Sequence, residues 1–370
     1  MEFRDKTLEE LQKHRSTASA KNALVGLDGF IDEIVHPVAQ RRGQGDDFTA
    51  MKKIAEFGQR IVDAAGKSTN IELAPKLEKL GGNGPIMANA LHEAGVKTRY
   101  IGALGKPDIH PLFKDFAKKT DAISICDPAH TTAVEFEDGK IMLGTMASLD
   151  KITFDEVIKT MGEGAFLDLF SRMDLISLIN WTMVPNMTAV FTGLLEKVLP
   201  ILPPHEHRIY FFDLCDPEKR SQGDLITALE TMMRFQSYGT VTLGLNLKEA
   251  RQVGDALGIP TQTVDEKGLK TLASLIRQKL EIGTVVVHPK ESAACATRED
   301  TFWIPGPYVE QPLITTGAGD HFNAGFSTGQ LLGLSPLGCL TLGVSFSGFY
   351  VRTAKSPSLS DIEEFIRNWK

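Results

Sequence analysis

The sequence predicts an α/β protein built around one mostly parallel sheet, and three observations lead to this class. Short apolar, β-rich runs alternate with longer amphipathic segments along most of the 370 residues. Strand–helix–strand repeats imply right-handed crossovers that place helices on both faces of a sheet. Apolar residues make up 42% and charged residues 24% of the chain, as in ordinary globular proteins. We therefore predict a single α/β domain over residues 1–370, with a small inserted β lid.

The predicted elements follow one another in a regular order. The first strand is NALVGLDGF (22–30), and the helix-like PIMANALHEAG (85–95) precedes the strand KTRYIGALG (97–105). Later strands are DLISLIN (174–180), HRIYFFDL (207–214), TVTLGLN (240–246) and GTVVVHP (283–289), with helical patterns at 225–235 and 247–257. Ligands bind such sheets outside the carboxyl ends of the strands, so we expect the functional site there.

One segment interrupts this order. TTAVEFEDGKIMLGTM, residues 131–146, contains two β-prone runs joined at Asp138-Gly139, which is a strong hairpin signal. A hairpin inside an α/β chain is typical of a flap over a site or of a sheet extension. We place the lid at approximately 33–50 and 125–147. An exposed lid hairpin can pair across a homodimer, and the sequence leaves the oligomeric state open.

Charge and composition argue against several classes of protein. The net charge is −7 with acids and bases mixed, whereas a nucleic-acid surface needs a basic stripe. No apolar run is long enough to cross a bilayer, and MEFRDKTLEELQKH lacks the apolar centre of a secretory signal. The four cysteines lie far apart and fit neither a CxxC metal pattern nor a small disulfide scaffold. We expect a reduced cytoplasmic protein that binds small molecules, with neither nucleic acid nor membrane as a partner.

The stretch LITTGAGDHFNAGF, residues 313–326, carries the strongest chemical signal. Gly317, Ala318 and Gly319 are small enough for successive N–H groups to turn toward one point. A helix that opens at Asp320 adds the positive potential of its N-terminus. This arrangement suits a transferring phosphoryl group, with Asp320 as the base that takes the acceptor's proton. The alternative is a glycine turn followed by an N-cap aspartate, and this stretch alone leaves the two interpretations level.

Two weaker motifs lie at the same predicted edge of the sheet. Asn246 and Glu249 follow a strand three residues apart, where they could hold hydrated Mg²⁺ against phosphates or simply cap a helix. Gly82 and Asn83, in a GGNG loop before a helix, could meet a polyol or could form an ordinary turn. Upstream, Asp28 and Asp32 follow the first strand, where their carboxylates can accept hydrogen bonds from vicinal hydroxyls.

Together and in this order, the motifs resemble the ribokinase (PfkB) family of carbohydrate and nucleoside kinases. The resemblance covers nearly the whole chain, and TGAGDHFNAGF is its most specific part. It implies a ribokinase-like three-layer α/β/α sandwich with a small β lid. It also implies transfer of the γ-phosphate of Mg-ATP to a hydroxyl of a small sugar or sugar-like substrate.

The resemblance also assigns roles to individual residues. It implies Asp320 as catalytic base and Gly317, Ala318 and Gly319 as the anion hole. Asn246 and Glu249 look like the Mg-phosphate motif, with Glu249 reaching Mg²⁺ through water. The acceptor contacts are Asp32 and, less directly, Asp28, with Gly82 and Asn83; the nucleotide contacts are Lys290, Thr316, Asn323 and Ser347.

Several positions depart from the family pattern, and most lie on the nucleotide side. Ile314 replaces an aspartate that helps hold an activating monovalent cation in relatives, so the resemblance leaves potassium activation open. His288-Pro289-Lys290 replaces a Thr-x-Gly turn, where the lysine can neutralise phosphate and the choice between ATP and ADP stays open. Val344 and Ser347 stand where relatives often have Asn and Gly, and Ile86 where an asparagine is frequent.

We predict a carbohydrate kinase, because a protein that only binds sugar has no need of a proton acceptor at Asp320. Two alternatives stay open. One is a non-catalytic sugar or nucleotide sensor on a kinase scaffold. The other is a nucleoside kinase, which needs an aromatic-lined acceptor pocket; its candidates are Phe30, Phe48 and Phe136.

Overall fold

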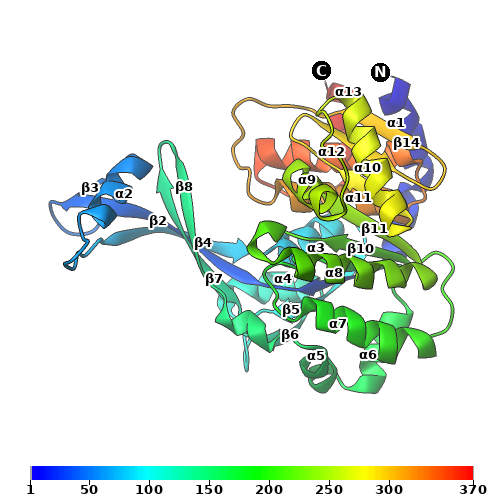
Figure 1. Ribbon diagram of the computed structural model, residues 1–370, viewed down its shortest axis with the longest axis horizontal. Coiled ribbons are helices and arrows are strands. Elements are labelled where there is room, and N and C mark those ends of the chain that lie inside the picture. The colour runs from blue at the N-terminus through cyan, green and yellow to red at the C-terminus, as the bar shows by residue number, and fades with distance from the viewer. Residues whose placement is uncertain (1, 370) are drawn as a thin grey trace.

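The computed structural model describes residues 2–369 and has two sheets (Figure 1). The larger sheet has nine strands in the order β14-β13-β12-β11-β10-β9-β1-β5-β6. Its pairs from β6 to β12 are parallel, and only β13 and β14 are antiparallel, which confirms the predicted mostly parallel sheet. The strands are β1 (Asn22–Leu27), β5 (Lys97–Ala103), β6 (Ile123–Cys126), β9 (Leu175–Leu178), β10 (Ile209–Asp213), β11 (Thr240–Leu245), β12 (Thr284–Val287), β13 (Ser292–Ala296) and β14 (Thr301–Pro305).

Helices cover both faces of this sheet, which gives three layers. The first core packs one face against α5 (Phe154–Met161), α6 (Glu163–Ser171), α7 (Met187–Gly193), α8 (Gln222–Arg234), α9 (Leu247–Ala256) and α10 (Glu266–Leu280). The second packs the other face against α1 (Glu2–His14), α3 (Asn83–Glu93), α4 (Lys114–Lys119), α11 (Ala318–Leu331), α12 (Pro336–Thr353) and α13 (Leu359–Asn368). Because both faces are covered, central strands such as β12 are buried along their full length and consist of apolar and β-branched residues.

The smaller sheet, which we call the lid sheet, projects to one side of the body in Figure 1. It contains β2 (Phe30–Arg41), β3 (Phe48–Ala50), β4 (Leu73–Gly81), β7 (Ala129–Phe136) and β8 (Gly139–Thr145). Most of the two segments predicted for the lid lies in this sheet, whereas residues 125–126 end β6 of the larger sheet; β7 and β8 form the expected hairpin. The sequence analysis missed β4, which pairs with β2 along most of its length. A small core of its own, centred on Val35, Val134 and Phe136, packs the sheet against α2 (Ile54–Val62).

The topology brings the predicted motifs to one edge of the larger sheet. Strands β10, β11 and β12 are neighbours and parallel, so the residues that follow them meet at one carboxyl edge. The lid sheet starts directly after β1, since only Asp28 and Gly29 separate β1 from β2. Across residues 2–369, none of the helices combines the length and hydropathy that a membrane span requires.

Candidate active site

A cavity of about 520 Å³ opens at this carboxyl edge. Loops after β10, β11 and β12 form one wall, and the N-terminus of α11 with one side of α12 forms the other. Many of the residues singled out in the sequence line it: Asn83, Asn246, Glu249, Lys290, Gly317, Ala318, Gly319, Asp320 and Ser347. Asp28, Asp32, Gly82, Thr316 and Asn323 do not line it. The structure therefore brings the phosphoryl-side motifs together and separates several of the others from this cavity.

Helix α11 begins two residues before Asp320, where the sequence analysis had placed its start. The helix begins at Ala318, and its N-cap is Gly317 with φ +93°, a left-handed conformation that favours glycine. Asp320 is the third helical residue, so the N-cap alternative for Asp320 is wrong. The N–H of Ala318 donates to the Thr315 carbonyl at 3.2 Å, a long contact. Within residues 2–369, the N–H groups of Gly319 and Asp320 have no acceptor and are free donors at this helix end.

Asp320 is buried, with 5% of its surface exposed. One carboxylate oxygen accepts a hydrogen bond from Asn83 Nδ2 at 2.8 Å, which joins the GGN loop to the start of α11. Burial raises the pKa of Asp320 to about 8; the hydrogen bond from Asn83 opposes this rise, while the charges of Asp28 and Glu249 add to it. A carboxylate that titrates near neutral pH is matched to the task of a general base.

Asp213 is a lining residue that the sequence analysis missed. It is the last residue of β10, and its Oδ2 accepts a hydrogen bond from Asn323 Nδ2 at 2.9 Å. Its Oδ1 is buried and has no partner among the described residues. Burial, and then the charges of Glu249 and Asp320, raise the pKa of Asp213 well above its usual value. The available signal was an acid at the end of the predicted strand HRIYFFDL, at the edge where ligands bind.

Asn323 has a different place from the one predicted. Its side chain is fully buried beneath the cavity and bonds Asp213, so it does not reach a nucleotide from the cavity wall. Its role is to hold Asp213. Thr316 also points elsewhere, since its hydroxyl lies 2.5 Å from the Lys140 ammonium on the lid hairpin.

Asn246 and Glu249 form a capping box at the start of α9. Asn246 Oδ1 accepts from the Glu249 N–H at 3.0 Å, and Glu249 Oε2 accepts from the Asn246 N–H at 2.9 Å. The other oxygen of Glu249 accepts from the Asp216 N–H at 3.0 Å. Burial raises the pKa of Glu249, while these backbone donors lower it. The capping interpretation is therefore confirmed, and it holds both side chains rigidly at the cavity.

Asp28 does not act as an open acceptor of sugar hydroxyls in this structure. It is fully buried, and its oxygens accept hydrogen bonds from Asn180 Nδ2 at 2.6 Å and from the N–H groups of Asn83 at 3.0 Å and Gly84 at 2.8 Å. The prediction of a sugar contact is corrected to an anchor for the GGN loop, because the carboxylate already has donors on both oxygens. Gly82, with φ +99°, sits in that loop beside Asp28.

Asp32 lies on the lid sheet, in register with Lys79 of β4 and Thr131 of β7. Burial raises its pKa, and the charge of Lys79, a hydrogen bond with Thr131 and the charge of Lys140 oppose that rise. Lys140 therefore acts on Asp32 and also contacts Thr316 beside the anion-hole loop. The lid sheet and the loop that precedes α11 therefore meet at this lysine.

Part of the cavity lining is apolar. Pro307, Val344 and Val351 line the cavity together with the Ser347 side chain and Lys290. His288 stacks on Phe322 with ring centres 4.4 Å apart, and burial lowers the pKa of His288 to about 4. The imidazole is therefore neutral here, and Lys290 is the cation of this loop.

The aromatic residues considered for a nucleoside pocket are placed elsewhere. Phe136 belongs to the lid core and packs against Phe57 with ring centres 5.6 Å apart. Phe30 is buried in the first core, and Phe48 lies under the Arg41 guanidinium. None of the three lines the cavity.

Comparison with known proteins identifies the family. A family model described as prokaryotic ketohexokinase matches residues 6–369. A ketohexokinase of Haloferax volcanii is 26% identical over 346 residues, which cover 92% of this chain and 90% of that protein. Among solved structures, the Methanocaldococcus jannaschii nucleoside kinase, an archaeal member of the ribokinase family, has a TM-score of 0.63 at 13% identity, covering 94% of this chain and 98% of that one. An Arabidopsis thaliana ribokinase complexed with ribose and ATP has a TM-score of 0.62 at 14% identity, with 94% and 98% covered.

The structural matches show that the fold is the ribokinase fold, which confirms the resemblance and the fold class predicted from the motifs. The family match spans nearly the whole chain and adds the type of reaction. The chain belongs to the prokaryotic ketohexokinase family and is a carbohydrate kinase, a phosphotransferase whose acceptor is an alcohol group.

Proposed function

We propose that this kinase transfers the γ-phosphoryl group of Mg-ATP to a primary hydroxyl of a ketohexose, with Asp320 as the catalytic base. One observation carries the proposal: a buried carboxylate with a pKa near 8 stands in the helix end whose free N–H donors line the same cavity. The sugar class follows from the family and from the Haloferax volcanii relative, which is a ketohexokinase.

The residues at the cavity fit a hydrated divalent cation. Asp213 Oδ1 is buried without a partner, and its carboxylate has Glu249 and Asp320 as charged neighbours. Within residues 2–369 no three ligating side chains converge on one point, and Mg²⁺ held mainly by water and phosphates needs only one or two carboxylates. Asp213 and Glu249 would hold the ion, Glu249 through water. When bound, Mg²⁺ neutralises charge on the phosphate oxygens.

In the proposed reaction the hydroxyl oxygen forms a bond to the γ-phosphorus while the bond from that phosphorus to the departing ADP oxygen breaks. Asp320 takes the hydroxyl proton as the new bond forms, and Asn83 orients the Asp320 carboxylate through its 2.8 Å hydrogen bond. The free N–H groups of Gly319 and Asp320, with that of Gly317, donate to the phosphoryl oxygens in the transition state, while the Ala318 N–H closes the turn by donating to the Thr315 carbonyl. Lys290, which also lines the cavity, neutralises the polyphosphate.

The lid sheet supplies a cover for the site. The whole chain acts as one ribokinase-like domain, and the hairpin of β7 and β8 closes over the acceptor to exclude water, which is a competing acceptor. The contact between Lys140 and Thr316 supports this role, because it already joins the hairpin to the phosphoryl side.

The outer part of the lid sheet also suits a second copy of the chain. Leu77, Ile34, Ala133 and Met142 form a row across four neighbouring strands, and α2 covers the opposite face. Leu77 and Met142 are 53% and 45% exposed. An apolar row of this length on a sheet is a surface that self-association would bury.

The test is phosphoryl transfer from Mg-ATP across ketohexoses, aldohexoses, pentoses, polyols and nucleosides, with Asp320→Asn as the matched variant. We expect sugar phosphate from a ketohexose, and a loss of at least a thousandfold in kcat for Asp320→Asn with sugar binding retained. Turnover by Asp320→Asn at the parent rate would refute the base. Product from nucleosides alone would refute the ketohexose.

A further inference from the structure

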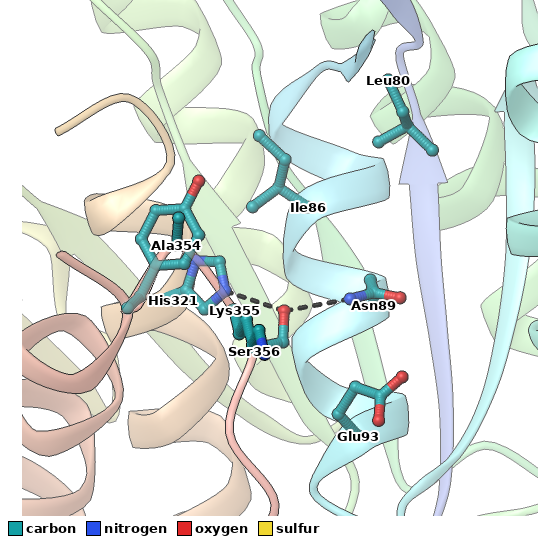
Figure 2. Close-up of a pocket in the computed structure, with 9 residues that line it drawn as sticks. Leu80, Ile86, Asn89, Glu93, His321, Ala354, Lys355 and Ser356 are labelled. Carbon is teal, nitrogen blue, oxygen red and sulfur yellow. Dashed lines mark hydrogen bonds between the residues drawn. The ribbon is translucent and has the colours of Figure 1, made fainter. Parts of the chain in front are cut away.

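The anion-hole loop has a second side, whose carbonyls point away from the cavity described above. A cavity of about 430 Å³ lies there between α3, α11 and the end of α12, and it shares no lining residue with the first (Figure 2). Figure 2 shows the His321 ring and the Ser356 hydroxyl pointing toward each other, with Asn89 of α3 beyond them. Nothing in the proposed reaction uses these side chains.

Three hydrogen bonds connect α3 to this loop through a single imidazole. His321 Nδ1 lies 2.7 Å from the Gly317 carbonyl oxygen and Nε2 lies 2.9 Å from Ser356 Oγ. A carbonyl can only accept, so Nδ1 carries the hydrogen and Nε2 accepts from the Ser356 hydroxyl. Asn89 Nδ2 donates to Ser356 Oγ at 2.9 Å. The donors in this series of hydrogen bonds therefore all run in one direction and end at the Gly317 carbonyl, which also accepts from the His321 backbone N–H at 3.0 Å.

Tyr350 holds the neighbouring carbonyl. Its hydroxyl donates to the Thr316 carbonyl at 3.0 Å, and its ring stacks on His321 with centres 3.7 Å apart and planes 13° from parallel. A Cβ atom on Gly317 would lie 3.1 Å from the Tyr350 hydroxyl and 3.3 Å from Ile86, so side chains enclose the loop closely on this side.

A peptide unit is planar, so the direction of a carbonyl fixes the direction of the next N–H. Holding the Thr316 carbonyl orients the N–H of Gly317, which has no acceptor among residues 2–369. Holding the Gly317 carbonyl fixes the next peptide, whose Ala318 N–H donates to the Thr315 carbonyl at 3.2 Å and closes the turn that leads to the free N–H groups of Gly319 and Asp320. Gly317 at φ +93° is the point where a freely turning glycine would otherwise lose that orientation.

We propose that His321 and Tyr350, which we call the back clamp, are positioning residues that hold the Thr316 and Gly317 peptides so that the Gly317 N–H, and the free N–H groups that follow the turn, stay aimed at the transferring phosphoryl group. The Ser356 and Asn89 side chains set the His321 tautomer. This inference rests on the proposed function of the loop. Burial lowers the pKa of His321 to about 4, so the imidazole stays neutral and the tautomer persists over the working pH range.

The first experiment separates the hydrogen bond from the packing. His321→Phe keeps an aromatic ring against Tyr350 but removes the donor to Gly317, and His321→Asn restores a donor without the ring. We expect kcat of His321→Phe to fall at least tenfold while KM for the sugar changes less than about twofold, and His321→Asn to recover most of the loss. His207→Phe, in an exposed loop, is the matched control. A His321→Phe enzyme that is folded and works at the parent kcat would overturn the proposal.

A second pair of measurements covers the case in which His321→Phe does not fold. Tyr350→Phe and Ser356→Ala should each lower kcat, and the two combined should lose less than the product of the two separate factors, because both act on one loop. In ¹⁵N spectra of the parent, the histidine signal that His321→Asn removes should show hydrogen on Nδ1 and should not titrate between pH 6 and 8. Hydrogen on Nε2 instead would overturn the assignment.

Failure of this inference can be told apart from failure of the proposed function. If the parent transfers phosphate and loses it in Asp320→Asn, while all back-clamp variants keep the parent kcat, only the clamp is refuted. If the parent shows no phosphoryl transfer with any acceptor, the proposed function itself is refuted.

Discussion

At the scale of single residues, Asp320 should set the pH dependence of catalysis. Its pKa near 8 means that the carboxyl is mostly protonated at pH 6 and 7, and a protonated carboxyl cannot accept the sugar proton. We therefore expect kcat/KM to rise about tenfold per pH unit below pH 8 and to level off above it. Bound cations favour the ionised form of the Asp320 carboxyl, so kcat should rise at lower pH than kcat/KM does. A flat kcat/KM profile between pH 6 and 9 would contradict this assignment.

Single residues also show where sequence reasoning reaches its limit. The position of Asp320, in the first turn of a helix after a glycine-rich loop, could be predicted because it depends only on adjacent residues. Asp28 was assigned to the sugar because its position after β1 is known from sequence, but its hydrogen bonds with Asn83, Gly84 and Asn180 depend on loops far away in the chain. Asp213 was missed for the same reason, since its importance comes from Glu249 and Asp320 as neighbours.

At the scale of elements, the capping box at α9 gives Asn246 and Glu249 both a structural and a chemical task, and substitutions can separate the two. Glu249→Gln removes the charge and leaves one acceptor oxygen, because its NH₂ group then faces the N–H of Asn246 or of Asp216. We expect the Mg²⁺ concentration for half-maximal rate to rise about tenfold or more, and the melting temperature to fall through the lost hydrogen bond. Asn246→Ala should cost about 1 kcal/mol of stability through the lost cap, whereas Asn246→Ser keeps the cap.

The matched control for that experiment is the second capping box of the chain, formed by Ser358 and Asp361 at α13. Asp361→Asn perturbs an equivalent cap far from the cavity and should leave the Mg²⁺ dependence unchanged. An equal shift in Glu249→Gln and Asp361→Asn would mean that the motif only caps a helix.

The lid hairpin is the element that joins the two halves of the site. Lys140→Met should lower kcat about tenfold, a change of about 1.4 kcal/mol, and should raise the ratio of ATP hydrolysis to sugar phosphorylation. Lys140→Arg should retain most of the activity. Lys118→Met, on the exposed side of α4, is the control. Unchanged turnover and unchanged hydrolysis in Lys140→Met would remove Lys140 from the proposed closure.

The hairpin itself was predictable, because the turn signal at Asp138-Gly139 separates two β-prone runs. Strand β4 was not, because the stretch 73–81 (LAPKLEKLG) contains a proline, two lysines and a glutamate between its leucines, and no β-branched residue. It forms a strand because it pairs with β2 at eight positions. This pairing is a tertiary interaction, so local β-propensity does not predict it. Elements held by their neighbours are the ones that sequence patterns miss.

At the scale of the whole molecule, the three-layer architecture was the most predictable feature. Buried parallel strands such as β11 and β12 are continuous apolar runs between amphipathic helices, and that pattern repeats along the chain. The arrangement of strands in the sheet was not predicted, because their order depends on which crossovers pack best after the chain has collapsed.

The row of apolar residues across the lid sheet, which includes Leu77 and Met142, leads to a prediction about the oligomeric state. If a second copy covers Leu77 and Met142, the parent should elute and scatter light as a dimer, and Leu77→Lys should shift it to a monomer without loss of secondary structure. Ile201→Lys changes an equally exposed apolar residue (62% exposed) far from the lid and serves as the control. A monomeric parent at micromolar concentration would refute this surface as a strong interface.

Strand β1 of the body passes directly into β2 of the lid sheet, so a movement at this junction is carried along the whole length of β2. Strand β2 has 12 residues, and at about 3.3 Å per residue it forms an arm of roughly 40 Å. The strand leaves the body at Gly29, where the Ala129 N–H of β7 donates to the Gly29 carbonyl at 2.8 Å, next to the Asp28 anchor of the GGN loop. A rotation of about 10° at that junction would move the tip through about 7 Å. A small rotation at the base of the projecting lid would therefore become a large displacement at its tip (Figure 1), and a pair of fluorophores on tip and body would report it.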